Sequence, residues 1–322
     1  MQQPCLPNRA RALRSLTFAA AAFSALGARA SAQSRPVIRV ATLPSEAAAE
    51  VFYAQEMGFF ANAGIDVDIQ IMQNGAAVAA AVASNAVDVG WTTPVSLAIA
   101  RQKGIPFLTI APAVLYTSAA PFTALFVAQG SPIRTASDLR GKVIGANGLG
   151  TMTEYGPRAW IDRNGGDSTQ VRFLELPFSA MVDSLVAGRV DAAEIGEPAL
   201  AVATAKNHLL AYPMNAVASE FMFGVWFGGM AWVKAHADLV ARFAGAIHNT
   251  AVWANTPANQ VRSGAILSQY TKIPIPVIAT MTRARYGEAL TAALMQPVID
   301  VAAHYLHFAS FPAQELIYAP AR

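Results

Sequence analysis

Two segments near the start of the chain alternate between apolar and polar residues. They are residues 37–41, Val-Ile-Arg-Val-Ala, and residues 65–71, Ile-Asp-Val-Asp-Ile-Gln-Ile. Alternation with many β-branched side chains predicts β-strands. The intervening residues 46–60 predict a helix, and the asparagine and glycine at 62–64 are typical of a helix end.

The same order of elements continues along the chain. Asn74-Gly75 opens an alanine-rich helix, residues 87–90 (Val-Asp-Val-Gly) predict a third strand, and Pro94 suits the first turn of another helix. Strands that alternate with helices in this way are typical of an α/β fold with a largely parallel sheet.

Part of this pattern returns about a hundred residues later. Residues 171–193 again predict strand, helix and strand, and in each half a helix end is followed by Val-Asp, at 87–88 and 190–191. So short a match can arise by chance, since helix, turn and strand recur in every α/β protein. However, residues 138–146 also open the second half with a turn and a strand, as residues 37–45 open the first. We therefore predict two comparable α/β lobes.

The first 32 residues have the three zones of a secretory signal peptide. Three arginines lie between residues 9 and 14, residues 16–26 are apolar but too few to span a bilayer, and residues 30–32 read Ala-Ser-Ala. The alternative, an N-terminal helix of the fold, is disfavoured because polar residues and a proline break the segment before the first strand. We expect cleavage after Ala32 and a periplasmic protein.

Removal of this leader changes what the net charge implies. It contains four arginines and no acidic residue, so the formal charge falls from +3 to −1 and the basic character of the whole chain is lost. A nucleic-acid partner is therefore not expected. Cys5, the single cysteine, also lies in the leader and precedes its apolar zone, so it cannot carry a lipid and the mature protein should have no disulfide.

A series of short motifs follows in a fixed order. They are Glu-Met-Gly-Phe-Phe at 56–60, Ala-Gly-Ile-Asp-Val at 63–67, Asn-Ala-Val-Asp-Val-Gly at 85–90, Asp-Leu-Arg-Gly-Lys at 138–142, Leu-Val-Ala-Gly-Arg-Val-Asp-Ala at 185–192 and Glu-Pro at 197–198. Together they resemble the substrate-binding proteins of ABC importers for nitrate, sulfonate, taurine and related compounds, a branch that also contains thiamine-pyrimidine-precursor binders. The resemblance covers nearly the whole chain after the leader.

The resemblance implies a type II periplasmic-binding-protein fold, with two α/β lobes joined by two crossover strands and a cleft between them. It places the crossings near residues 123–128 and 221–227. Residues 33–125 plus 226–322 would then form a discontinuous lobe I, and residues 126–225 would form lobe II.

The resemblance also implies a function. The chain would be an extracytoplasmic solute-binding protein that captures a sulfonate, a carboxylate or a related small molecule by lobe closure. It would act as a monomer without a cofactor and deliver its ligand to an ABC permease with a cytoplasmic ATPase. The alternative is a thiamine-pyrimidine-precursor binder, or a biosynthetic enzyme of the same fold.

Ligands of open parallel sheets bind beyond the C-terminal ends of the strands, where helix N-termini also present unpaired amides. This rule selects the loops after each predicted strand. Their side chains offer aromatic surface, hydroxyls, an amide and two carboxylates: Ser45, Glu46, Asn74, Trp91, Thr92, Thr93, Thr151, Met152, Thr153, Phe178 and Glu197. We predict that these residues bind the ligand and that none binds a metal.

Several of these side chains have an alternative role. Trp91 can equally belong to the hydrophobic core, and the two threonines before Pro94 can cap its helix. The charge of Glu197 would repel an anionic ligand unless a water, a cation or a hydroxyl lay between them. Arg158, two turns into a predicted helix, is the nearest spare positive charge, although such an arginine is more often a solvated surface group.

Enzymes and transcription regulators would leave signatures that this sequence lacks. Some relatives of this fold make a thiamine pyrimidine with a histidine and cysteines, but the mature chain has no cysteine and its five histidines lack metal-ligand spacing. His304 and His307 share a helix face, where a surface position explains them better. No nucleophile elbow, Walker loop or dinucleotide fingerprint is present, so we expect no catalysis. A transcription regulator would need a helix-turn-helix where the leader lies.

Overall fold

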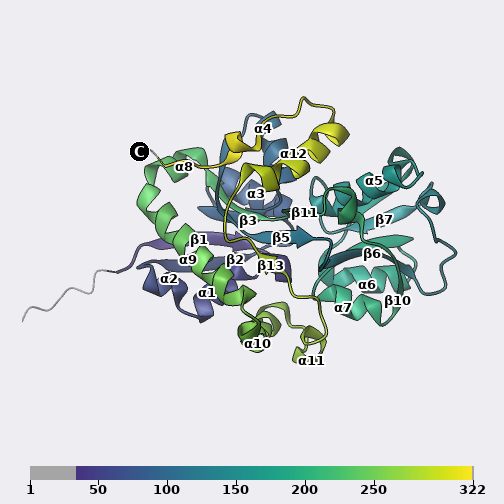
Figure 1. Cartoon of the computed structure of the whole chain (residues 1–322), viewed down its shortest axis with the longest axis horizontal. Coiled ribbons are helices and arrows are strands. Elements are labelled where there is room, and N and C mark those ends of the chain that lie inside the picture. Colours follow the sequence, from purple (N-terminus) through teal and green to yellow (C-terminus); the bar gives the residue numbers. More distant parts are fainter. Residues whose placement is uncertain (1–33, 321–322) are drawn as a thin grey trace, which may run out of the picture. The chain divides into compact units, whose positions relative to one another are not determined.

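Three β-sheets organise residues 34–320, the part of the chain that the structure, a computed structural model, describes (Figure 1). The described residues from Pro36 onward form one compact unit. The predicted signal peptide and its cleavage site lie outside the described residues. No helix in the described range combines the length and apolarity needed to cross a bilayer.

The first sheet has five strands in the order β2-β1-β3-β12-β4. Their bounds are β1 (Val37–Thr42), β2 (Asp66–Ile71), β3 (Val89–Thr92), β4 (Phe107–Pro112) and β12 (Val225–Gly229). β1 pairs in parallel with both β2 and β3, whereas β12 runs antiparallel to β3 and β4. The strands predicted by alternation therefore form the parallel part of this sheet.

The second sheet has the order β10-β6-β9-β7-β8. Its strands are β6 (Thr123–Ala128), β7 (Val143–Ala146), β8 (Arg172–Glu175), β9 (Ala192–Gly196) and β10 (Asn207–Ala211). β7 pairs in parallel with β8 and β9, and β6 lies antiparallel between β9 and β10. Strands β7, β8 and β9 thus repeat the arrangement of β1, β2 and β3, which confirms the predicted repeat.

The repeated Val-Asp pair has the same structural task in both sheets. The Asp88 carboxylate accepts a hydrogen bond from the backbone amide of Arg39, and the Asp191 carboxylate accepts one from that of Val143, each at 2.9 Å. Both aspartates also face a basic side chain, Arg39 at 2.6 Å and Lys142 at 3.3 Å. In each sheet the aspartate therefore fixes the start of the central strand against its neighbour.

A small third sheet lies where the chain passes between the two large ones. It has the order β11-β5-β13, with β5 (Val114–Thr117), β11 (Glu220–Met222) and β13 (Arg285–Tyr286). The first passage follows β5 and ends before β6, so residues 123–128 are a strand of the second sheet and not the crossing segment expected there. The second passage runs through β11 into β12.

Helices cover the sheets and follow most of the parallel strands. The predicted helix at 46–60 is divided into η1 (Glu46–Ala48), α1 (Glu50–Glu56) and α2 (Phe59–Asn62). Gly58, which adopts a left-handed conformation with φ 73°, separates α1 from α2. The remaining helices before the second passage are α3 (Gly75–Ala83), α4 (Pro94–Gln102), η2 (Ser137–Leu139), α5 (Met152–Arg163), η3 (Ser168–Gln170), α6 (Phe178–Val186), α7 (Ala199–Thr204) and η4 (Pro213–Ala216).

The C-terminal part is mainly helical and returns to the first sheet. Its elements are α8 (Met230–Ala235), α9 (Ala237–Asn255), η5 (Pro257–Asn259), α10 (Gln260–Thr271), α11 (Ile275–Ile278), α12 (Ala292–Leu306) and η6 (Ala313–Leu316). Apolar residues recur at helical spacing in residues 241–247 and 295–305, which lie within α9 and α12. Buried residues of both belong to the same hydrophobic core as the first sheet.

The second sheet is buried on both faces, and its strand residues divide between two cores. Ala124, Phe126 and Ile195 pack with residues of α6, whereas the alternate residues Leu125 and Val127 pack on the other face. Successive side chains of a strand point to opposite faces, which explains this division. Helices on both faces leave the ends of the strands as the accessible surface of this sheet.

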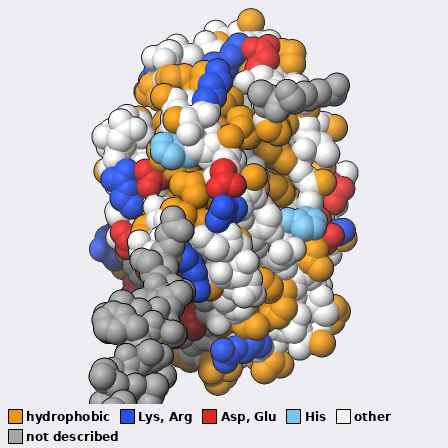
Figure 2. Space-filling model, turned by 90° about the vertical axis from the view of Figure 1, so that its left-hand side faces the viewer, with side chains coloured by type: hydrophobic (Ala, Val, Ile, Leu, Met, Phe, Trp, Pro, Cys, Tyr) orange, Lys and Arg blue, Asp and Glu red, His pale blue; other side chains and the backbone are white. Residues whose placement is uncertain are grey.

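One end face of the molecule is shown in Figure 2. Lysine and arginine side chains lie there among acidic and apolar ones and do not gather into a single basic patch. This face offers no continuous positive surface for a nucleic acid.

Candidate functional site

A pocket lies where the C-terminal ends of the parallel strands of both sheets meet. Leu43, Ser45, Gly75 and Thr93 line it from the loops of the first sheet, and Asn147, Thr151, Thr153 and Gly196 line it from the second. This is the location that the strand-end rule predicts. The cavity is small, about 30 Å³, which is room for roughly one or two water molecules.

Four aromatic side chains form the apolar wall of the pocket. Trp91 comes from β3 and Phe178 from the start of α6, while Phe122 and Phe223 come from the two passages between the sheets. The rings of Phe122 and Phe223 are 5.2 Å apart in an edge-to-face contact. The sequence-based reasoning missed these two phenylalanines. The expected crossing at 123–128 directly follows Phe122 and the one at 221–227 contains Phe223, so these segments could have indicated both residues.

Trp91 is held in place by a close contact with the backbone. A Cβ atom built on Gly224 would lie 2.4 Å from Cζ2 of Trp91, so only glycine fits at position 224. The indole is buried, yet its Nε1 has no hydrogen-bond partner among the described residues. An indole nitrogen can only donate, so this N–H, which lies against Gly224, has no acceptor in the described structure.

Polar groups of the pocket stand at helix N-termini. Thr151 caps α5, since its Oγ1 accepts from the Thr153 amide at 3.3 Å. Thr93 precedes α4 but makes no capping hydrogen bond, and its buried Oγ1 has no partner in the described structure. Capping therefore does not account for Thr93. Its hydroxyl and the helix amides nearby favour a ligand with hydrogen-bond acceptors.

A second and larger cavity adjoins the pocket. It has a volume of about 110 Å³ and shares Ser45, Phe178, Gly196 and Glu197 with the inner pocket. Gln73 and Thr271 are among its other lining residues. Among residues 34–320, no lysine or arginine lines either cavity.

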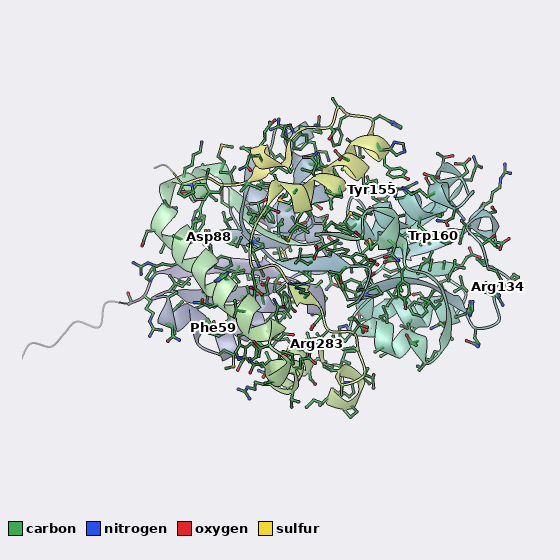
Figure 3. The ribbon with its side chains drawn as sticks, viewed as in Figure 1. Phe59, Asp88, Arg134, Tyr155, Trp160 and Arg283 are labelled. Carbon is green, nitrogen blue, oxygen red and sulfur yellow. The ribbon has the colours of Figure 1, made fainter. Side chains whose placement is uncertain are left out.

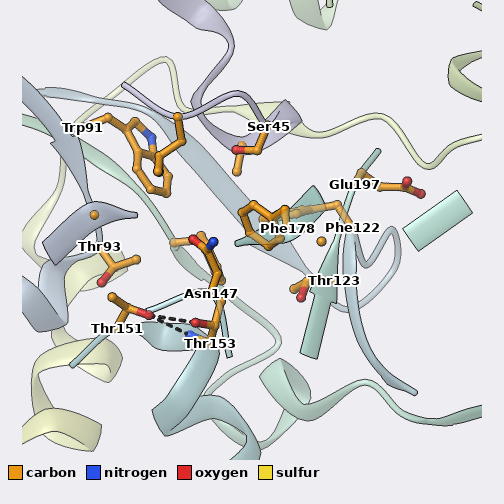
Figure 4. Close-up of a pocket in the computed structure, with 15 residues that line it drawn as sticks. Ser45, Trp91, Thr93, Phe122, Thr123, Asn147, Thr151, Thr153, Phe178 and Glu197 are labelled. Carbon is orange, nitrogen blue, oxygen red and sulfur yellow. Dashed lines mark hydrogen bonds between the residues drawn. The ribbon is translucent and has the colours of Figure 1, made fainter. Parts of the chain in front are cut away.

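Of the residues that the structure describes, only Glu197 lines these two cavities with an ionisable side chain. Its carboxylate is directed away from the other labelled side chains of the pocket (Figure 4). One oxygen accepts from the amide of Ala201 at 3.1 Å and the other from the amide of Thr282 at 3.0 Å. Burial raises the pKa of Glu197 to about 7, although both amides and Arg283 act in the opposite direction.

A second buried carboxyl lies beneath the pocket. Glu194 is fully buried, and one of its oxygens is hydrogen-bonded to the hydroxyl of Thr123, which lines the pocket. The other oxygen has no partner in the described part of the chain. Burial raises the pKa of Glu194 to about 8, and the bond from Thr123 lowers it by less. Glu194 therefore holds its proton at neutral pH.

Of the eleven predicted site residues, seven line the inner pocket: Ser45, Trp91, Thr93, Thr151, Thr153, Phe178 and Glu197. The other four have structural contacts and do not line it. Met152 is buried in the core, and Thr92 donates to the carbonyl of Gly75. Glu46 is buried in an ion pair with Arg283 at 2.9 Å.

Asn74, the fourth of these residues, connects the two sheets. Its Oδ1 accepts from the amide of Ala77 and caps α3, and its Nδ2 donates to Glu175 of β8 at 3.0 Å. A second bond runs the other way, from Asn147 to the carbonyl of Gln73 at 3.1 Å. The pocket is thus bordered by direct hydrogen bonds between loops of the two sheets.

Further contacts between the two halves involve α12 and α4. Tyr155 of α5 lies beside α12 (Figure 3), where its ring stacks on Tyr305. The Tyr305 hydroxyl donates to Asp162 at 2.8 Å. Ser96 of α4 donates to the carbonyl of Gly150 at 3.1 Å. The second sheet is therefore held to the first on several sides of the pocket.

Arg158 does not line the pocket. Its guanidinium donates to Glu154 at 2.8 and 3.0 Å and to the carbonyl of Ser168, and it lies over the ring of Phe173. From the sequence, the positive charge of Arg158 had no assigned partner. In the structure, these contacts provide one. Within residues 34–320, no three histidine, cysteine, aspartate or glutamate side chains are grouped so that they could hold a metal ion.

Two solved structures with a similar fold are sulfonate-binding proteins. The periplasmic aliphatic sulphonate binding protein SsuA from Escherichia coli has a TM-score of 0.70 at 16% identity, covering 90% of this chain and 94% of that chain. The alkanesulfonate-binding protein SsuA from Xanthomonas axonopodis pv. citri, bound to MOPS, has a TM-score of 0.74 at 17% identity, covering 89% and 99%. These neighbours confirm the predicted periplasmic-binding-protein fold.

The same fold also occurs in an enzyme. The desulfurization enzyme DSZB matches with a TM-score of 0.64 at 13% identity, over 87% of this chain and 94% of that chain. At these identities the likeness shows the fold and not the activity.

Sequence comparison adds a relative and a family. The formylaminopyrimidine-binding protein of Halalkalibacterium halodurans is 28% identical over 142 residues, which span 44% of this chain and 41% of that protein. The match therefore covers less than half of the relative. The model of the family described as NMT1/THI5 like matches residues 45–259, about two thirds of the chain. The chain belongs to the NMT1/THI5-like family.

Proposed function

We propose that this protein is an extracytoplasmic solute-binding protein of an ABC importer, which captures a small organic molecule between two lobes. The observation that carries the proposal is the pocket, because loops of both sheets and both passages between them contribute to its walls. A ligand held by all of these elements would stabilise the arrangement in which they meet. No bond in the ligand is broken.

The lobes of this proposal follow the sheets. Lobe I comprises residues 33–125 plus 226–322 and lobe II residues 126–225, with the first boundary better placed at Phe122 because β6 begins at Thr123. The small third sheet lies at both passages and would act as the hinge. Signal-peptide cleavage after Ala32 would release the protein into the periplasm as a monomer, and N-terminal sequencing of the exported protein tests the site.

The ligand should carry a hydrogen-bond acceptor next to an apolar or aromatic body. Trp91 and Thr93 supply buried polar atoms without partners among the described residues, and the four aromatic rings supply apolar surface. The inner cavity of about 30 Å³ holds little more than water, so a larger ligand would extend past Phe178 into the outer cavity. Sulfonates, carboxylates and carbonyl-bearing heterocycles all meet this description.

A thermal-shift screen of the purified protein tests the proposal. A compound present at a hundred times its dissociation constant adds about 2.7 kcal/mol of stability. Two probes follow from the similar proteins, MOPS and formylaminopyrimidine. Sulfonates and carboxylates of increasing chain length extend the set. The proposal predicts at least one compound that raises the melting temperature and whose effect disappears in Trp91→Ala.

An enzyme of the same fold is the second candidate, because DSZB shares the architecture. The two functions differ in what happens to a bound compound. A binding protein returns it unchanged, whereas an enzyme converts it with steady turnover. Incubation of each hit with the protein, followed by mass spectrometry of the compound, separates them. Delivery to a permease served by a cytoplasmic ATPase is tested by uptake assays with the hit compound.

A further inference from the structure

Glu197 makes contacts that a ligand-binding carboxylate would not need. It follows β9 of the second sheet and is 3% exposed. Its side chain reaches Thr282, which lies between α11 and β13 in the C-terminal part of the chain. Its main-chain carbonyl accepts from the amide of Glu46 at 3.2 Å, in the loop that follows β1. One residue of the second lobe is thus bonded to two segments of the first.

The segment that receives Glu197 is firmly anchored. Arg283, the neighbour of Thr282, donates to Glu46 at 2.9 Å, to the carbonyl of Gln260 at 3.0 Å and to the hydroxyl of Ser263 at 3.0 Å. Figure 3 shows Arg283 on the side where α10 and α11 lie. The amide of Thr282 is therefore presented from a rigid part of the first lobe.

The bonds of Glu197 depend on how the lobes are placed. The bond to Ala201 lies within the second lobe and would survive any hinge motion, whereas the bonds to Thr282 and Glu46 join the two lobes. A buried carboxylate without its donors is costly, and hydrogen bonds to a charged acceptor are stronger than neutral ones. Movement of the second lobe away from Thr282 would open this contact to water.

We infer that Glu197 is a positioning residue that latches the second lobe to the first through Thr282 and Glu46, and that it does not bind the ligand with its carboxylate. This inference rests on the proposed function, because it gives the lobe closure a specific contact. The charged groups that face Glu197 are Glu46 and Arg283, which are paired with each other. The raised pKa of Glu197 agrees with a carboxyl that the closed arrangement shields from water.

Distances between the lobes test the latch without any ligand. Spin labels are placed on Val186→Cys in α6 and Val261→Cys in α10, which are 59% and 86% exposed, in a Cys5→Ser background. Pulsed electron paramagnetic resonance then gives the distribution of distances between the labels. We expect Glu197→Ala to shift this distribution to longer distances and to broaden it.

Two further variants identify the cause of such a shift. Glu197→Gln keeps one oxygen that can accept from Thr282 but sets its NH2 group against the amide of Ala201, so it should lengthen the distances less than Glu197→Ala does. Glu197→Asp keeps the charge but is one methylene too short to reach Thr282, so it should behave like the alanine variant. Asp183→Ala, an exposed acidic residue of α6, is the control and should change nothing.

The inference is overturned if Glu197→Ala and Glu197→Asp leave the distances unchanged, or if Glu197→Gln opens the protein as much as Glu197→Ala. Circular dichroism melting confirms that each variant is folded, and the aspartate variant replaces the alanine variant if the latter does not fold. An unchanged distribution would leave the proposed function intact as long as compounds still raise the melting temperature. Absence of any binding compound would remove the function but not the interlobe contact.

Discussion

Glu194 allows a quantitative test of how the second sheet and the pocket floor are built. Its carboxyl is fully buried, bonded to Thr123 through one oxygen and unpartnered at the other among the described residues. Folding therefore removes this carboxyl group from water but does not supply a hydrogen-bond donor to each oxygen of its ionised form. We expect the protein to lose stability as the pH rises above 6, and Glu194→Gln to remove most of that loss.

The size of the effect follows from the pKa of this carboxyl in the unfolded and in the folded protein. An exposed glutamate has a pKa of 4.5, and burial raises that of Glu194 to about 8 in the folded protein. Between these values the folded protein keeps a proton that the unfolded chain has released, so rising pH favours unfolding. The free energy of unfolding should fall by about 1.4 kcal/mol per pH unit between the two pKa values and by less close to pH 8, which gives about 2 kcal/mol between pH 6 and pH 8. This contribution is complete below pH 4.5 and lost above pH 8.

Urea unfolding at pH 6 and pH 8, followed by circular dichroism, measures the difference. Glutamine has nearly the same shape and no charge, so Glu194→Gln should be about 2 kcal/mol less sensitive to this change of pH than the wild type. Glu197, whose pKa burial raises to about 7, remains in both proteins and accounts for residual sensitivity. Glu220→Gln, an exposed substitution, is the control. Equal pH sensitivity in wild type and Glu194→Gln would refute the reasoning.

Three further predictions concern the pocket and the repeat. Trp91→Phe keeps an aromatic ring but loses the N–H, and should weaken a confirmed ligand about fivefold in isothermal titration calorimetry, whereas Trp232→Phe on α8 should have no effect. Gly224→Ala places a methyl group against Trp91 and should displace the indole, which would be measured as lost ligand affinity and altered tryptophan fluorescence. A methyl group at position 229 meets open space, so Gly229→Ala should show neither effect. Asp88→Ala should lower the free energy of unfolding in urea by about 2 to 3 kcal/mol, and Asp191→Ala should lower it by about 1 kcal/mol. The difference is expected because Asp88 is more buried and accepts more hydrogen bonds. Equal losses in the two variants would contradict this account.

The parallel strands and the repeat could be predicted because they depend on local alternation and on the Val-Asp pairs. Their ends could not. β3 and β9 begin later than expected, at Val89 and Ala192. The preceding aspartates bond the neighbouring strand in two ways, because the amides of Asp88 and Asp191 donate to the carbonyls of Arg39 and Val143, and their carboxylates accept from the amides of the same two residues. The break between α1 and α2 within the predicted helix at 46–60 depends on the left-handed conformation of Gly58, which periodicity alone does not reveal.

In the candidate site, some residues could be predicted from the ends of the strands, whereas others depend on contacts between residues that are far apart in the sequence. The rule that ligands lie beyond the C-terminal ends of parallel strands selects Trp91, Thr93, Thr151 and Phe178, all of which line the pocket. It cannot select Phe122, which comes from a passage between the sheets and precedes a strand. Residues of that kind become visible only when the order of the strands is known.

The direction of the Glu197 side chain changes what the pocket can bind. From the sequence, a carboxylate in the cleft argues against an anionic ligand. In the structure both oxygens accept amide hydrogen bonds, one of them from Thr282, which is 85 residues away in the chain. The Glu197 carboxylate therefore points away from the inner pocket and is held at its edge. The polar groups that remain in the inner pocket are helix N-termini and the atoms of Trp91 and Thr93 that have no partner in the described structure. These groups favour an acceptor, charged or neutral, so the repulsion that Glu197 suggested does not limit the ligand to a cation.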